Sequence, residues 1–231
     1  MCRAREWATF SDMAEHFEAR VYSRAEYISD AVVHASGIGA ALVGGPVLIA
    51  LAAVWIGDPG LVAGMAVYAM ALLAMWICSA CYNMITVPDW ADRLRRVDQS
   101  AIYMKIAGTY TAFIALGASQ VGFLALIWAV AVAGASIVLW SGRRYRVIAI
   151  ALYLGLGWAG AVLGGPLVSS LSDAGFWLLS AGGLLYTFGV GFLLWHRLPF
   201  HNTIWHCFVL VASLACYGAI LVELAGAATQ V

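Results

Sequence analysis

Long apolar stretches without basic residues alternate in this chain with short polar stretches that hold all of its 12 Lys and Arg residues except Lys105. A helix needs about 20 apolar residues to cross the hydrocarbon core of a bilayer. The pattern therefore predicts an all-α, polytopic membrane protein with seven transmembrane helices. Their expected positions are about Gly37–Ile56, Leu61–Val87, Asp98–Ala118, Val121–Trp140, Val147–Leu163, Phe176–Trp195 and Asn202–Ala225.

The basic stretches predict the orientation of these helices. They precede the first segment, follow the second and the fourth, and precede the seventh, whereas the other connections and the C-terminal end contain no Lys or Arg. Short basic loops stay on the cytosolic side of a membrane. We therefore expect a multi-pass protein of the cytoplasmic membrane, with its N-terminus in the cytosol and its C-terminus outside. The basic residues used are Arg3, Arg5, Arg20, Arg24, Arg93, Arg95, Arg96, Arg143, Arg144, Arg146 and Arg197.

Composition indicates a single membrane domain. With 64% hydrophobic and 10% charged residues, the chain has no room for a large soluble domain. A net charge of zero gives no support for nucleic acid binding, no soluble partner is indicated, and membrane lipid is the expected partner. The oligomeric state is left open.

Two regions are expected. Residues 1–35 form a cytosolic N-terminal segment with an amphipathic helix on the membrane surface, and residues 36–231 form the seven-helix domain. The surface helix is predicted from apolar residues at helical spacing. Those residues are Phe10, Met13, Phe17 and Val21, and Glu26, Asp30 and His34 continue the helix on one face.

Polar residues within the apolar segments gather at one depth. Ser79 and Asn83 lie one turn apart at the cytosolic end of the second segment, Asp98 opens the third, and Asn202 and His206 lie one turn apart in the seventh. Polar groups in a membrane face a protein interior or a water-filled cavity. Three helices are therefore predicted to share one pocket near the cytosolic face.

Five motifs resemble those of the haemolysin III family, which belongs with the progestin and adipoQ receptors. The run Ser79-Ala-Cys-Tyr-Asn83 resembles S-x-x-Y-H, and Asp98-Gln-Ser-Ala-Ile-Tyr resembles D-H-S-A-I-Y. Segments 181–189 and 202–209 are similar to the family's sixth and seventh helices, and Glu26-x-x-x-Asp30-x-x-x-His34 resembles E-x-x-x-N-x-x-T-H. The resemblance covers about residues 24–220 in the family's order.

This resemblance implies a zinc site made of one His from the second helix and two from the seventh, with an Asp and a Ser beside it. Such a site would support hydrolysis of a lipid amide or ester, as in ceramidases. On this pattern Asp98 and Ser79 are the candidate catalytic residues. Asn83 and Asn202 stand at two of the three His positions, so His206 is the one family ligand that remains.

A side-chain amide is a weak ligand for zinc, so the substitutions at 83 and 202 disfavour a bound metal. No cofactor is expected. We predict that the purified protein carries well under one zinc per chain, and that Asn83→His together with Asn202→His raises its zinc content.

Two further pocket residues each have two interpretations. Lys105 lies seven residues after Asp98, so it could pair with this carboxylate and replace the charge of the metal, or it could extend towards the cytosol. His34 could form an acid–base pair with Asp30, or it could be a histidine of the membrane interface, which we favour.

Three functions follow. A lipid-binding or regulatory protein, descended from a hydrolase, would need only the pocket. A metal-dependent hydrolase would need a metal held by His206, Asp98 and a further ligand such as Cys81 or His34. A membrane-perturbing protein would need a polar stripe through the whole bilayer, and the polar residues gather at one end. We favour the first.

Overall fold

The computed structural model describes residues 22–117, 120–141 and 146–230. The predicted surface helix around Phe10, Met13, Phe17 and Val21 lies outside the described residues. The described elements are all helical: α2 (Arg24–Trp55), α3 (Pro59–Met84), α4 (Pro88–Ala115), α5 (Val121–Ser141), α6 (Arg146–Leu163), α7 (Gly165–Ser169), α8 (Asp173–Leu194) and α9 (His201–Ala228).

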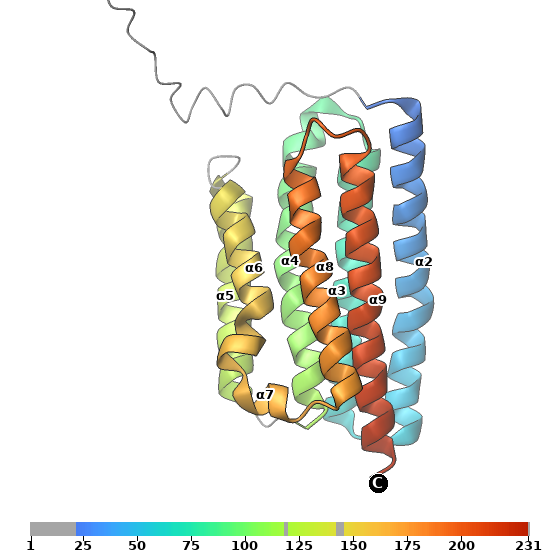
Figure 1. Cartoon of the computed structure of the whole chain (residues 1–231), viewed down its shortest axis with the longest axis vertical. Helices are drawn as coiled ribbons and strands as arrows, with labels where there is room; N and C mark the ends of the chain where they lie inside the picture. Colours follow the sequence, from blue (N-terminus) through green and yellow to red (C-terminus); the bar gives the residue numbers. More distant parts are fainter. Residues whose placement is uncertain (1–21, 118–119, 142–145, 231) are drawn as a thin grey trace, which may run out of the picture.

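The long helices run up and down in one bundle (Figure 1). Neighbours in the chain pack together, as α2 on α3, α3 on α4, α4 on α5 and α8 on α9, and α2 also packs against α9. The core contains large side chains such as Tyr68, Trp76 and Tyr103, each at most 1% exposed. The first described helix therefore lies beside the last one.

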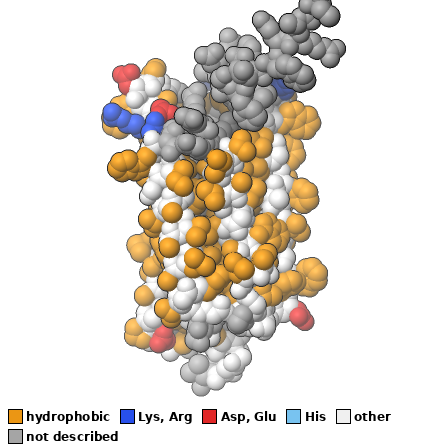
Figure 2. All heavy atoms as spheres, turned by 90° about the vertical axis from the view of Figure 1, so that its left-hand side faces the viewer, with side chains coloured by type: hydrophobic (Ala, Val, Ile, Leu, Met, Phe, Trp, Pro, Cys, Tyr) orange, Lys and Arg blue, Asp and Glu red, His pale blue; other side chains and the backbone are white. Residues whose placement is uncertain are grey.

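Five of the described helices are long and apolar enough to cross a membrane, namely α2, α3, α5, α8 and α9. Residues 147–163 of α6 form a shorter apolar helix. Large hydrophobic side chains are exposed along the bundle, among them Val54, Trp140 and Val162. Figure 2 shows one face of the bundle, where hydrophobic side chains are spread between two ends that carry the charges. An outer surface of this kind fits contact with lipid chains.

The seven predicted segments overlap α2, α3, α4, α5, α6, α8 and α9, but two of these helices begin earlier than hydropathy indicates. Helix α2 begins at Arg24, where Ser23 and Glu26 form a capping box. The helix runs without a break across residue 35, so Asp30 and His34 belong to the same helix as the apolar stretch after them.

Helix α4 begins at Pro88, and its first turns are charged, which excludes it from the apolar spans. Arg95 and Arg96 both donate to Asp92, at 2.6 and 2.8 Å, and these bonds, with Arg95 foremost, hold the pKa of the Asp92 carboxyl below its usual value. Polar side chains bonded within one helix stabilise it without any apolar signal in the sequence.

The basic ends of the helices lie together. The start of α2, the α3–α4 connection and the α8–α9 connection are at one end of the bundle, opposite the C-terminus (Figure 1). The charge asymmetry of the sequence is thus an asymmetry between the two ends of the molecule. The number of spans and their orientation in a membrane stay predictions.

Candidate functional site

Three pairs of polar residues, each pair one helical turn apart, meet near the basic end of the bundle. They come from α2 (Asp30 and His34), α3 (Ser79 and Asn83) and α9 (Asn202 and His206). Residues four apart lie on the same face of a helix, so each helix presents two polar side chains to the centre. The predicted meeting of the second and seventh segments is confirmed by these contacts.

The start of α9 is tied directly to α2. Glu26 accepts hydrogen bonds from the backbone N–H of Ser23 at 2.9 Å and from that of Phe200 at 2.9 Å. Phe200 has a φ of 58°, a left-handed conformation that is uncommon for a residue with a side chain. The bond from Glu26 helps to hold this turn, which sets the height at which Asn202 and His206 face α2.

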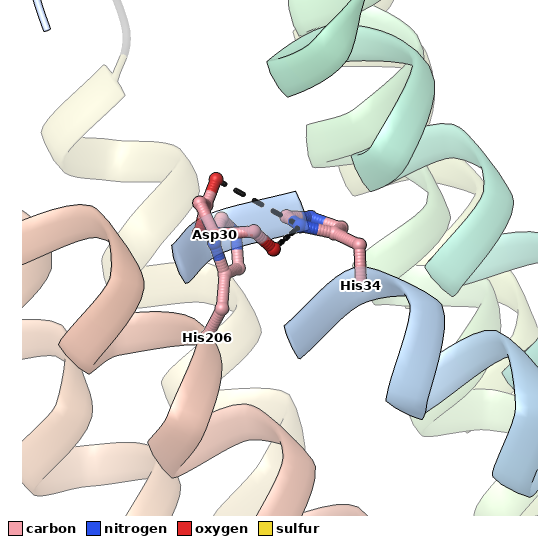
Figure 3. A group of neighbouring side chains, drawn as sticks. All are labelled: Asp30, His34 and His206. Atoms are coloured by element: carbon pink, nitrogen blue, oxygen red, sulfur yellow. Dashed lines mark hydrogen bonds and ion pairs between the residues drawn. The ribbon is translucent and has the colours of Figure 1, made fainter. Parts of the chain in front are cut away.

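Asp30 lies at the centre of the site, with three donors around it. Its carboxylate accepts from His206 Nδ1 at 2.6 Å and from Asn202 Nδ2 at 3.1 Å. Its backbone carbonyl accepts from His34 Nδ1 at 2.8 Å. Figure 3 shows the Asp30 side chain between the two imidazoles. A single buried residue therefore orients both rings.

Ser79 lies on the other side of the two imidazoles. Its Oγ is 3.2 Å from His34 Nε2 and 3.3 Å from His206 Nε2, and the Asp98 carboxylate interacts with the same hydroxyl. The ring centroids of His34 and His206 are 4.3 Å apart. The two candidate catalytic residues, Ser79 and Asp98, are thus neighbours of His206. Their catalytic role stays a prediction.

Asn83 and Asn202 bond to each other. Asn202 Nδ2 donates to Asn83 Oδ1 at 2.9 Å, and Asn83 Nδ2 donates to the backbone carbonyl of Ser79 at 2.9 Å. The two amides therefore cross-link α3 and α9 at the positions where the family pattern has imidazoles.

His34 lies in the site and not at the membrane interface. It is 1% exposed and contacts Ser79, His206 and, edge-on, the indole of Trp76. The alternative of a polar pair with Asp30 therefore describes His34, and the favoured placement at the membrane interface does not. Asp30, which the sequence analysis named only as a possible acid–base partner of His34, lies at the centre of the cluster.

Lys105 does not pair with Asp98. Its ammonium donates to the hydroxyl of Tyr186 on α8 at 2.6 Å and lies 4.4 Å from the centroid of that ring. Lys105 is 4% exposed, so it does not extend to the cytosol either. Both expectations for this residue are wrong, because the side chain points across the bundle to α8 and not along α4.

Lys105 is one of the residues that line a cavity of about 170 Å³. The wall of this cavity comes from α3, α4, α6, α7, α8 and α9 and is largely apolar, with Trp158, Trp205 and Phe113 among the aromatic residues. Some of the lining residues of α6 and α8, such as Ala161 and Thr187, are exposed, so the cavity reaches the side of the bundle. The hydroxyl of Tyr186, bonded to Ser213 at 2.7 Å, is the partner of Lys105 at its inner end.

The model of haemolysin III-related proteins matches residues 24–217. The chain belongs to the haemolysin III family. It is 35% identical to a hemolysin-3 homolog of Bacillus subtilis (strain 168) over 85% of this chain and 93% of that protein. It is 34% identical to hemolysin-3 of Bacillus cereus, over 85% and 90% of the two chains.

A more distant relative is the human monocyte to macrophage differentiation factor, at 31% identity over 67% of each chain. Together with the apolar helices, these relatives show that this haemolysin III-family chain is a multi-pass membrane protein.

The zinc set that the family resemblance implies does not fit this chain. Of positions 83, 202 and 206, only His206 carries an imidazole, and the amides at the other two positions are already bonded to each other. A different group is available, because ligand atoms of Asp30, His34 and His206 all lie within 4.8 Å of one another. The candidate metal ligands of this chain therefore lie on α2 and α9, whereas those of the family pattern would lie on α3 and α9.

Proposed function

We propose that this haemolysin III-family protein crosses the membrane seven times, with its N-terminus in the cytosol, and binds an anionic amphipathic lipid in the cavity beside Lys105. The observation that carries the lipid is the cavity itself, an apolar hollow that contains one buried ammonium group. The orientation is supported by the gathering of the basic connections at one end of the bundle.

The lining selects for a hydrocarbon chain. Hydrophobic side chains from six helices line the cavity, and the exposed lining residues on α6 and α8 support a mouth at the side of the bundle, where lipid tails would reach it. A cavity of about 170 Å³ has room for part of one acyl chain and not for a whole phospholipid.

The buried cation selects for a negative head group. In the described part of the chain, Lys105 bonds to Tyr186 and has no carboxylate partner. A buried charge is costly unless an opposite charge compensates it. A carboxylate or phosphate that accepts from the Lys105 ammonium and the Tyr186 hydroxyl would supply that compensation.

Binding to the purified protein in detergent tests this function. A dibrominated stearate should quench the fluorescence of Trp158 and Trp205. The affinity of its methyl ester should be lower by roughly tenfold or more, because the ester has no charge to pair with Lys105. A brominated lysophosphatidate tests a phosphate head in place of the carboxylate.

Two variants complete the test. Lys105→Met should remove the preference for the anionic lipids, whereas Arg93→Met, which removes an exposed cation of the same helix, should keep it. Equal binding of acid and ester by the unmodified protein, or an unchanged preference in Lys105→Met, would contradict the proposal.

A metal-dependent lipid hydrolase is the second candidate, and the grouping of Asp30, His34 and His206 favours it. Release of fatty acid from a lipid amide, lost in both His206→Gln and Ser79→Ala, would support hydrolysis. A third candidate function, suggested by the word hemolysin in the name of a relative, is perturbation of membranes. A pore needs a polar passage, and the apolar lining of the cavity does not support one.

A further inference from the structure

The two buried imidazoles of the site turn the same ring nitrogen towards one point. The Nδ1 atoms of His34 and His206 each contact an oxygen that can only accept, the backbone carbonyl and the carboxylate of Asp30. Each Nδ1 must therefore carry a proton and donate it. In a neutral imidazole the other nitrogen, Nε2, is then an acceptor with a free lone pair.

Both of these lone pairs face Ser79 Oγ, at 3.2 Å from His34 and 3.3 Å from His206. A serine hydroxyl has one proton to donate, and the Asp98 carboxylate interacts with the same hydroxyl. Three acceptors thus compete for one proton. Two of the three acceptors therefore receive no proton from Ser79, a deficit that a cation between the two Nε2 atoms would meet.

The surrounding charges indicate the same deficit. Asp30 and Asp98 bring two carboxylates to this centre, and Asp30 is 5% exposed. Among the described residues, the buried Arg and Lys side chains are engaged elsewhere: Arg95 with Asp92 and Gln99, and Lys105 with Tyr186. Buried carboxylates are normally paired with a cation or bound to a metal.

The distances match a small tetrahedral ion. Ligand atoms at about 2.0–2.1 Å from zinc lie roughly 3.3 Å from each other. The separations of Ser79 Oγ from the two Nε2 atoms, 3.2 and 3.3 Å, are of this size. Metal-binding histidines usually donate their second N–H to a carboxylate or a backbone carbonyl, and Asp30 offers one of each.

We propose that His34 Nε2, His206 Nε2 and Ser79 Oγ form a binding site for one divalent transition-metal ion of the zinc class. Asp30 orients both imidazoles through their Nδ1 atoms, and Asp98 accepts the Ser79 proton and balances the charge. This ligand set differs from the three-imidazole set that the family resemblance implies, because His34 comes from α2. The site does not depend on lipid binding at Lys105.

The expected low zinc content rests on one retained imidazole, His206. With His34 in the site there are two imidazoles, which bind zinc far better than the amides of Asn83 and Asn202.

Metal content tests the site without any assay of activity. The full chain is purified in detergent without chelators, incubated with Zn²⁺, freed of unbound metal and measured by mass spectrometry. We expect about one zinc per chain, as for a single tetrahedral site. With Co²⁺ in place of Zn²⁺, we expect the visible absorption of tetrahedral cobalt, and added Zn²⁺ should remove it.

Variants identify the ligands. His34→Gln and His206→Gln should each lose the bound metal, and Asp30→Asn should weaken its binding roughly 10–100-fold, as for other outer partners of metal ligands. His201→Gln changes another buried histidine of α9, which contacts Tyr22, and should keep the metal. Elution from a sizing column shows which variants are folded.

Metal binding by the unmodified protein tests the proposed site even if a variant does not fold. Well under one zinc per chain after loading, or a cobalt spectrum of the octahedral aqueous type, would overturn the proposal and leave a protonated imidazole as the positive charge. Loss of zinc in His201→Gln to the same degree as in His34→Gln would also overturn it.

Discussion

On helix α4, two charged side chains seven residues apart contact different neighbours. Asp98 interacts with Ser79 of α3, and Lys105 donates to Tyr186 of α8. Their spacing on one helix is compatible with an ion pair, yet a long side chain can turn to either side of the helix axis. Which neighbour it contacts depends on the helices packed around α4.

Because Lys105 and Asp98 have separate partners, their substitutions should act independently. We expect the effects of Lys105→Leu and Asp98→Leu on thermal stability in detergent to add within about 0.5 kcal/mol in the double mutant. Lys105→Leu with Tyr186→Phe should instead be non-additive by about 0.5–3 kcal/mol, because these residues are in contact. Recovery of stability in the Lys105–Asp98 double mutant would revive the ion pair.

At the scale of elements, the position of α2 against α3 depends on close contact at glycine. A Cβ atom added to Gly37 would lie 2.5 Å from Cε2 of Trp76, whose side chain is 1% exposed. The same indole contacts the ring of His34 edge-on. Close packing at Gly37 therefore helps to place His34 in the site. Small residues serve this purpose at many helix contacts in membranes.

Substitution of Gly37 tests this packing. Gly37→Ala should destabilise the protein by about 1–3 kcal/mol, since the buried indole has no free space to move into. Gly39→Ala is the matched control, because a Cβ there meets nothing within 4 Å, and it should be neutral or slightly stabilising. Thermal unfolding in detergent measures both. Equal effects at the two positions would show that the indole shifts without cost.

At the scale of the whole molecule, the charged ends and the apolar sides divide the bundle as a membrane requires. The basic connections lie at the end opposite the C-terminus, and exposed hydrophobic side chains cover the length between the ends (Figures 1 and 2). The polar site around Asp30 lies towards the basic end, whereas the cavity beside Lys105 lies within the apolar part of the bundle.

A reporter fused after Val231 tests the orientation. An odd number of spans from a cytosolic N-terminus puts the C-terminus outside, so a reporter active only outside the cytosol should give a signal there. The same reporter placed at the basic connection around Arg93–Arg96 should give none. Absence of a signal from the C-terminal fusion would contradict the seven-span count.

The sequence by itself determined the class of this protein, the approximate helices and the depth at which Ser79, Asn83, Asn202 and His206 gather. Apolar length and loop charge are properties of consecutive residues, and membrane insertion reads them in that order. The family motifs also come from consecutive residues, and the family match confirmed them.

Only the tertiary structure decided which side chains share the site. Whether His34 faces lipid or His206 depends on the rotation of α2 about its axis, and this rotation follows from packing against α3 and α9. Lys105 was misplaced for the same reason, since its partner Tyr186 is 81 residues away in the chain. Contacts between helices depend on surfaces that form only when all the helices are packed, and no local pattern of residues records them.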